Sequence, residues 1–195
     1  MRTGDLIIFH KHNWRVLDIR DDMALIISEK VIEQQAYHHS CVDATWADCG
    51  LRTYLNGEFY DGFKAADKSR IVTVLNVNPD NPWYGAKGGE DTEDSIFLLS
   101  IEEVVCKYFG DSSAILRNPG KGKYKYWFNK HDENNAKRLA NVSWWLRSPG
   151  RNNRAAAYIH GLAANQSDSS GGCVGINGNS ISSVGGVRPA LWLKL

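Results

Sequence analysis

The sequence predicts an α+β fold made of small antiparallel sheets, two flanking helices and a long loop-rich C-terminal region. Short apolar runs separated by polar turn residues fill the first thirty positions, which is the pattern of an antiparallel meander. Two helix-start signals further along the chain are each followed by apolar residues at helical spacing. In the last fifty residues, two aromatic blocks enclose a run of small and polar residues.

The first three strands are expected at Leu6 to Phe9, Trp14 to Ile19 and Ala24 to Ser28. Polar tripeptides separate them, Lys11-His12-Asn13 and Arg20-Asp21-Asp22, and residues of this kind favour turns. The segment is therefore predicted to form the meander.

Two helices are expected in the middle of the chain. Thr45 with Asp48 three positions later is typical of a helix start and predicts a helix over about 46–56. Ser100 before Glu102 and Glu103 predicts a second helix that ends near Gly110. Shorter elements are expected as a helical turn at 65–70, a strand at 71–75 and a turn of helix at 134–139.

Four more strands are expected near the end of the chain. They are 144–147, 156–159, 173–176 and 187–193.

Length and composition favour a single domain over residues 1–195. A chain of 195 residues that is 43% hydrophobic has material for one core, and it contains no linker-like segment. Its net charge of +1 gives no reason to expect a nucleic-acid partner, and the basic stretch from Lys121 to Lys125 is interpreted as a solvated loop. No apolar run approaches the about 20 residues of a membrane span or the form of a signal peptide, so we expect a cytoplasmic protein as encoded. Display on a phage particle or cell surface through a partner stays open.

The sequence contains no strong signal for a cofactor or for catalysis. The four cysteines share no CxxC spacing, and His38, His39 and Cys41 have no second pair of metal ligands at a recognised spacing. No phosphate-binding glycine loop and no GxSxG motif is present. We therefore expect no metal, no cofactor and no enzymatic activity.

The segment Arg151 to Ser183 has an unusual composition. It holds five Gly, six Ser and five Asn, which favour loops and turns. Of the 32 Trp, Gln, Lys, Glu and Met residues in the chain, only Gln166 falls in this segment of 33 residues, where about six are expected by proportion. These five residue types are the ones that no codon ending in a pyrimidine encodes. We refer to Arg151 to Ser183 as the variable segment.

The blocks around the variable segment carry a resemblance. WWLRSPG at 144–150 and GGVRPALWL at 185–193, together with LRTYLN at 51–56 and DSIFLLS at 94–100, resemble a bacterial domain family of uncharacterised function that is common in gut Firmicutes. The resemblance covers nearly the whole chain. That family is similar to the formylglycine-generating-enzyme branch of the C-type lectin fold, some members of which are variable proteins of diversity-generating retroelements. In such systems, template adenines are randomised, so that AAC codons become NNC and none of the five depleted residue types is encoded.

The resemblance implies a C-type lectin-like fold in which the first and last strands pair and late loops form one exposed face. Its function would be the binding of a protein or glycan ligand, with specificity set by the variable segment. The predicted ligand-binding residues are Arg151, Asn152, Asn153, Arg154, Tyr158, His160, Leu162, Asn165, Ser167, Asp168, Ser169, Ser170, Cys173, Ile176, Asn177, Asn179, Ser180, Ser182 and Ser183.

A rigid frame is expected beneath this face. The aromatic residues Trp144, Trp145 and Trp192 are interpreted as core or loop-supporting side chains, because large rings contribute much buried area. Arg147 and Arg188 are expected to bind carbonyl or carboxylate oxygens that fix the path of the loops, although a direct role in an anionic ligand site stays open.

Two other functions stay open at this point. A fixed-specificity adaptor of a phage or cell surface would share the fold without diversification. An oxidative enzyme related to formylglycine generation would need reactive cysteines late in the chain, where this sequence has only Cys173.

Overall fold

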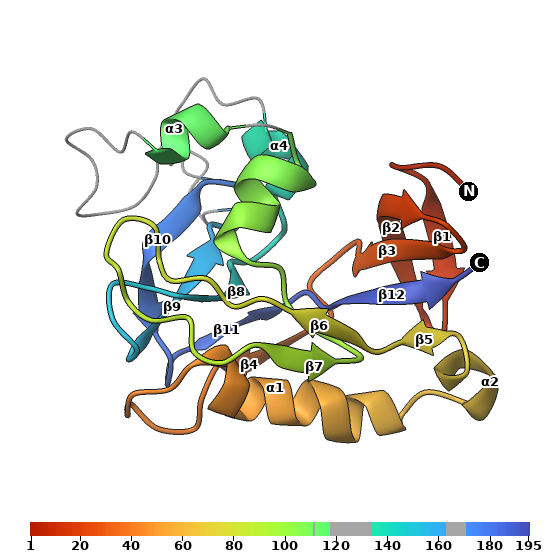
Figure 1. Cartoon of the computed structure of the whole chain (residues 1–195), viewed down its shortest axis with the longest axis horizontal. Coiled ribbons are helices and arrows are strands. Elements are labelled where there is room, and N and C mark those ends of the chain that lie inside the picture. Colours follow the sequence, from red (N-terminus) through yellow and green to blue (C-terminus); the bar gives the residue numbers. More distant parts are fainter. Residues whose placement is uncertain (111, 118–133, 163–170) are drawn as a thin grey trace.

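The computed structural model describes residues 1–110, 112–117, 134–162 and 171–195, and it is a mixed α+β structure. Two five-stranded sheets lie toward opposite ends of the long axis, and a two-stranded ribbon lies between them (Figure 1). Short helices surround the sheets. The α+β class predicted from the sequence is confirmed.

The first sheet has the strand order β1-β2-β3-β12-β5. Its strands are β1 (Leu6–Phe9), β2 (His12–Arg20), β3 (Met23–Ser28), β12 (Ala190–Lys194) and β5 (Ile71–Val72). The predicted meander is confirmed, since β1, β2 and β3 pair antiparallel in sequence order. The expected pairing of first and last strands is wrong, because β12 pairs with β3 and β5 while β1 lies at the far edge.

Two tight turns set the register of the meander. His10 and Asp21 each begin a two-residue loop and have φ values of 53° and 50°. A positive φ at this position suits the turns whose twist matches that of the flanking strands. The turns are His10-Lys11 and Asp21-Asp22, so they overlap the predicted polar tripeptides only in part: His12, Asn13 and Arg20 lie within β2.

The second sheet has the strand order β10-β9-β8-β11-β4. Its strands are β10 (Val174–Ser180), β9 (Ala155–Ile159), β8 (Trp144–Pro149), β11 (Val184–Val187) and β4 (Glu33–Ala36). Strand β8 pairs antiparallel with β9, and β11 joins it in parallel through Gly186 and Trp144. Two of its strands, β9 and β10, belong to the variable segment.

The strand expected at 187–193 is divided between the two sheets. Strand β11 ends at Val187 and β12 begins at Ala190. Pro189 has no N–H to donate within a ladder, so the strand breaks there, and its carbonyl accepts a 2.9 Å hydrogen bond from the N–H of Ser28. Residues 188–189 thus connect the two sheets (Figure 1).

The strand expected at 71–75 is also divided. Strand β5 ends at Val72, and β6 (Val74–Asn76) pairs with β7 (Thr92–Asp94) in the two-stranded ribbon. The buried carboxylate of Asp94 joins this ribbon to the first helical region. It accepts hydrogen bonds from Trp46 Nε1 at 2.9 Å, Arg52 Nε at 2.6 Å, Asn76 Nδ2 at 2.9 Å and Thr92 Oγ1 at 2.7 Å.

Both predicted helix starts are confirmed. The N–H of Thr45 donates to Asp48 Oδ1, and the helical region continues as η1 (Trp46–Asp48), α1 (Gly50–Tyr54) and η2 (Leu55–Phe59). Ser100 and Glu103 exchange hydrogen bonds of 2.8 and 3.2 Å at the start of the helix that contains η3 (Glu103–Lys107). The shorter helices are α2 (Ala65–Lys68), α3 (Ser113–Arg117) and α4 (Asn134–Arg138).

One aromatic-rich core extends through both sheets. Trp14, Trp46, Trp144 and Trp145 are each at most 2% exposed, and the core contains buried residues of both five-stranded sheets. Among the residues that the structure describes, no helix is long and apolar enough to cross a membrane.

Candidate functional site

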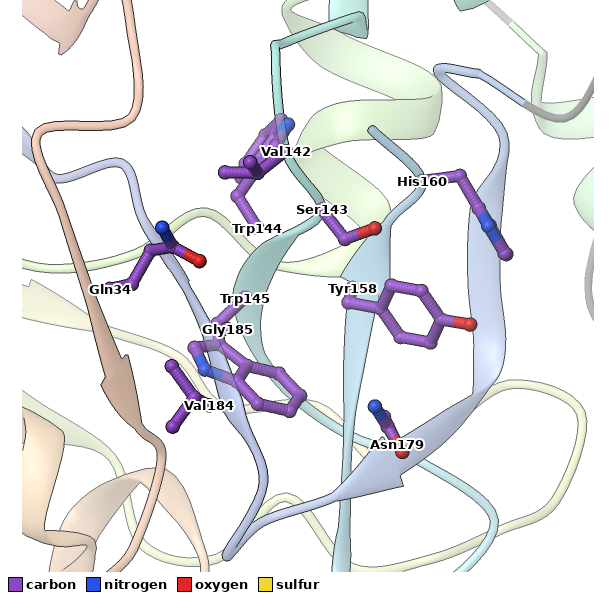
Figure 2. Close-up of a pocket in the computed structure, with 10 residues that line it drawn as sticks. All are labelled: Gln34, Val142, Ser143, Trp144, Trp145, Tyr158, His160, Asn179, Val184 and Gly185. Carbon is purple, nitrogen blue, oxygen red and sulfur yellow. The ribbon is translucent and has the colours of Figure 1, made fainter. Parts of the chain in front are cut away.

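A pocket of about 280 Å³ opens on the second sheet and is bordered by both frame and variable residues (Figure 2). Strands β4 and β11 contribute one side, and strands β9 and β10 the other. The lining residues are Gln34, Val142, Ser143, Trp144, Trp145, Tyr158, His160, Asn179, Val184 and Gly185.

The indole of Trp145 forms the rigid part of this pocket. It is 2% exposed, its Nε1 donates to the carbonyl of Gln35 at 3.0 Å, and Tyr37 packs edge-on against it at 6.0 Å. A Cβ atom on Gly185 would lie 2.5 Å from the indole, so only glycine fits beneath the ring. The first glycine of the GGVRPALWL block therefore makes room for the second tryptophan of the WWLRSPG block.

Tyr158 and His160 extend the aromatic surface along β9. The rings of Trp145 and Tyr158 are 6.4 Å apart and edge-to-face, and those of Tyr158 and His160 are 4.8 Å apart. A Cβ atom on Gly175 would lie 2.5 Å from the Tyr158 ring, so the neighbouring strand must carry glycine opposite it. Tyr158 thus lies against Trp145, and His160 lies against Tyr158.

Amide and hydroxyl groups border these rings. Figure 2 shows Gln34 and Asn179 on either side of the Trp145 ring. Ser143 Oγ accepts a 3.0 Å hydrogen bond from the N–H of Gly161, and Asn179 Oδ1 accepts one of 2.9 Å from the N–H of Ser180. Aromatic walls with a few polar groups are the usual make-up of a small ligand site.

A second group of predicted residues lies at the turns that end this sheet, away from the His160 end. The turn 151–154 and the turn 180–183 are joined by a hydrogen bond of 3.1 Å from the N–H of Ile181 to the carbonyl of Arg154. Arg154 forms an exposed ion pair of 2.9 Å with Asp43, and Asn153 Nδ2 donates to the carbonyl of Lys87 at 2.8 Å. The variable segment therefore contributes to two surface regions.

The structure separates the predicted ligand-binding residues into three groups. Those at least partly exposed are Arg151, Asn152, Asn153, Arg154, Tyr158, His160, Leu162, Asn177, Asn179, Ser180, Ser182 and Ser183. Asn165, Ser167, Asp168, Ser169 and Ser170 lie outside the described residues. Cys173 and Ile176 are both 0% exposed, so their prediction as contact residues is wrong, because Cys173 directly precedes β10 and Ile176 lies in its first part, where consecutive residues are buried.

The frame residues are buried, as predicted. Trp144, Trp192, Arg147 and Arg188 are between 0 and 8% exposed. Arg147 donates to the carbonyls of Leu98 at 2.8 Å and Val77 at 3.2 Å. Its guanidinium thus binds β8 to two other segments, as expected for a residue that fixes loop paths.

Arg147 also forms a buried ion pair with Glu103, and this pairing favours the ionised form of the Glu103 carboxyl group. Burial on its own raises the pKa of Glu103, but the charge and hydrogen bonds of Arg147 and the N–H of Ser100 outweigh it. The pKa of Glu103 in the folded protein is therefore lower than the ordinary value of 4.5.

This depressed pKa predicts a specific loss of stability in acid. A carboxyl group with a lower pKa in the folded than in the unfolded state stabilises the protein fully above the unfolded pKa, here 4.5, and loses that effect as the pH falls through the folded pKa. Urea unfolding at several pH values will show a stability difference between the wild type and Glu103→Gln that is constant near neutral pH and shrinks below 4.5. A difference that grows on acidification would contradict the ion pair.

The described residues show no clustered ligands for a metal. Within those ranges, no three or more His, Cys, Asp or Glu side chains gather in a way that would hold an ion. All four cysteines are free thiols, and burial raises the pKa of Cys49 to about 12, which keeps it protonated and unreactive at neutral pH.

Sequence reasoning missed part of the pocket. Gln34, Val142, Ser143, Val184 and Gly185 line it but lie outside the variable segment. Gly185 belongs to the GGVRPALWL block, so a close contact that only glycine allows could have been predicted there. The position of Gln34 depends on the pairing of β4 with β11, which no sequence pattern indicated.

Comparison with known proteins identifies a family but no activity. Residues 21–195 match the family model described as a domain of unknown function (DUF6273), and the chain belongs to that family. No curated protein matches the chain. No solved structure matches it either.

Proposed function

We propose that this member of a family without an assigned activity is a non-enzymatic ligand-binding protein whose specificity is set by the variable segment, Arg151 to Ser183. In this proposal it has a C-type lectin-like fold and is the variable protein of a diversity-generating retroelement. The ligand is a protein or a glycan. The fixed frame holds the binding surface in one conformation.

The observation that carries the proposal is the division of the pocket between the motif blocks and the variable segment. Trp145 and Gly185 belong to the two motif blocks that carry the family resemblance, whereas Tyr158, His160 and Asn179 belong to the segment with biased composition. Changes at the three variable positions would alter the walls of the pocket and leave its floor in place. Binding surfaces built on a rigid scaffold commonly separate these two tasks.

The chemistry of the pocket suits reversible binding. Tyr and Trp rings supply apolar area at a low cost in side-chain entropy, and amide and hydroxyl groups supply adaptable hydrogen bonds. An adaptor of fixed specificity is the second candidate, because the same pocket would serve one unchanging partner. The composition of the variable segment favours the diversified function over this one.

Sequencing of the DNA beside the gene tests the proposal directly. We expect a near-copy of the region that encodes residues 144–195, differing only at adenines, next to a reverse-transcriptase gene. Sibling loci should concentrate their substitutions between residues 151 and 183. A locus without a template copy, together with siblings that vary evenly along the chain, would contradict diversification and favour the fixed adaptor.

The proposal also predicts that exposed variable positions contribute little to stability. Arg151, Asn179 and Ser182 are exposed and make few side-chain contacts. Alanine at each should change the free energy of unfolding by less than about 0.5 kcal/mol, as measured by urea denaturation. Trp145→Ala serves as the matched frame variant. Losses as large as that of the frame variant at all three positions would show that the segment is structural.

A further inference from the structure

A second pocket, of about 560 Å³, lies between the first sheet and α4. It is distinct from the pocket on the second sheet and comes from different elements. Its wall includes the apolar side chains of Val16, Leu17, Phe109 and Leu139, with Arg188 among them. The volume is in the range that small organic ligands occupy.

Arg188 is a buried cation in this wall. Its side chain is 2% exposed, and its guanidinium lies 5.1 Å from the centre of the Trp144 ring. Its Nε donates to the carbonyl of Ser28 at 2.7 Å. Among the residues that the structure describes, the buried Nη1 has no hydrogen-bond partner. Leaving a buried charged donor without an acceptor destabilises the folded state, so the site favours an added acceptor.

The carboxylate of Glu29, which also lines the pocket, is already paired with Arg15. Arg15 donates to both oxygens of Glu29, from Nε at 2.8 Å and from Nη2 at 2.6 Å. The other cation in the wall, Lys137, is exposed and therefore well solvated. Burial lowers the pKa of Arg188 to about 10, which still leaves it charged at neutral pH. Glu29 acts on Arg188 only through its charge, which raises the pKa of Arg188, so among the described residues Arg188 is buried and forms no ion pair of its own.

We propose that this pocket binds a small organic carboxylate, with its apolar body against Val16, Leu17, Phe109 and Leu139 and its carboxylate on the guanidinium of Arg188. The terminal nitrogens of a guanidinium present parallel donors that match the two oxygens of a carboxylate. The four apolar side chains give an organic acid a contact surface that an inorganic anion cannot use, while the polar part of the wall is supplied by Thr3, Arg15, Glu29, Tyr108 and Lys137. The site does not depend on the function proposed for the variable segment.

Thermal unfolding of the whole chain with sodium hexanoate as the probe tests this site. Ionic strength is held constant with sodium chloride at pH 7, and the matched ligand is 1-hexanol, which has the same apolar chain without the charge. At about ten times its dissociation constant, hexanoate should raise the melting temperature by about 3 to 6 °C. The alcohol and inorganic phosphate should give much smaller shifts.

Variants separate the pocket from effects on folding. Arg188→Gln should abolish the hexanoate shift, and Lys64→Gln, which removes an exposed positive charge elsewhere, should retain it. If Arg188→Gln does not fold, Ala136→Phe tests the site with Arg188 in place. Ala136 is an exposed residue of α4 that lines the pocket, so the larger ring should fill the space, leave the unliganded melting temperature nearly unchanged and remove the shift.

Three results would overturn the proposal. They are no shift with hexanoate in the wild type, an equal shift with 1-hexanol or with phosphate, and an undiminished hexanoate shift in Ala136→Phe. Because none of these measurements involves the variable segment, failure here would leave the proposed ligand-binding function untouched.

Discussion

Replacement of Trp145 by alanine will lower the free energy of unfolding by about 3–5 kcal/mol, the usual cost of removing a buried Trp side chain. Trp145 is 2% exposed, and its ring contacts both Tyr37 in the core and Tyr158 in the variable segment. The deletion leaves a cavity above Gly185 that the backbone cannot fill, because β11 is held by β4 and β8. Urea denaturation followed by circular dichroism measures the loss.

Trp145→Phe is the control for this variant. It keeps most of the ring but loses the hydrogen bond from Nε1 to the carbonyl of Gln35, so it should cost about 1 kcal/mol for that bond plus a smaller packing loss. If Trp145→Ala costs less than about 1 kcal/mol, the residue is not a structural support of the pocket.

The second large effect is expected at Asp94. Asp94→Ala should lower the free energy of unfolding by about 3–5 kcal/mol, because it leaves the partly buried Arg52 without its carboxylate and three buried donors without an acceptor. The donors come from the first helical region and from both strands of the β6–β7 ribbon. Loss of the carboxylate therefore loosens the contact between them.

Glu93→Ala provides the matched control on the same strand. Glu93 neighbours Asp94, points to the exposed face, and accepts from Arg52 Nη2 through its backbone carbonyl. Its side chain should contribute less than about 0.5 kcal/mol. Equal effects of the two substitutions would mean that loss of charge, rather than the hydrogen-bond cluster, destabilises the protein.

Elements with a local signal were predictable from the sequence. The meander follows from apolar runs and polar turns, and both helix starts follow from a hydroxyl residue and an acidic residue three positions apart. These patterns act between residues that are close in sequence, so they do not depend on the rest of the fold.

Elements that depend on distant partners were not predictable. Strand β4 has the sequence EQQA, which has no strand preference, and it exists because β11 offers it a pairing edge. The segment 187–193 is uniformly apolar around Arg188 and Pro189. Its division into the end of β11 and most of β12 depends on pairing with strands of two different sheets, which the sequence does not show. The same holds for the pocket, where Tyr158 was predicted from the variable segment but Gln34 was not.

The interior position of β12 makes the first sheet depend on the residues that flank the variable segment on its C-terminal side. Strand β12 follows the variable segment in the chain, yet it lies between β3 and β5 inside the first sheet. A stop codon or frameshift within residues 151–183 would remove that strand and separate β5 from the meander. The truncated product would lack a complete core and be open to proteolysis, so only copies translated through β12 would accumulate.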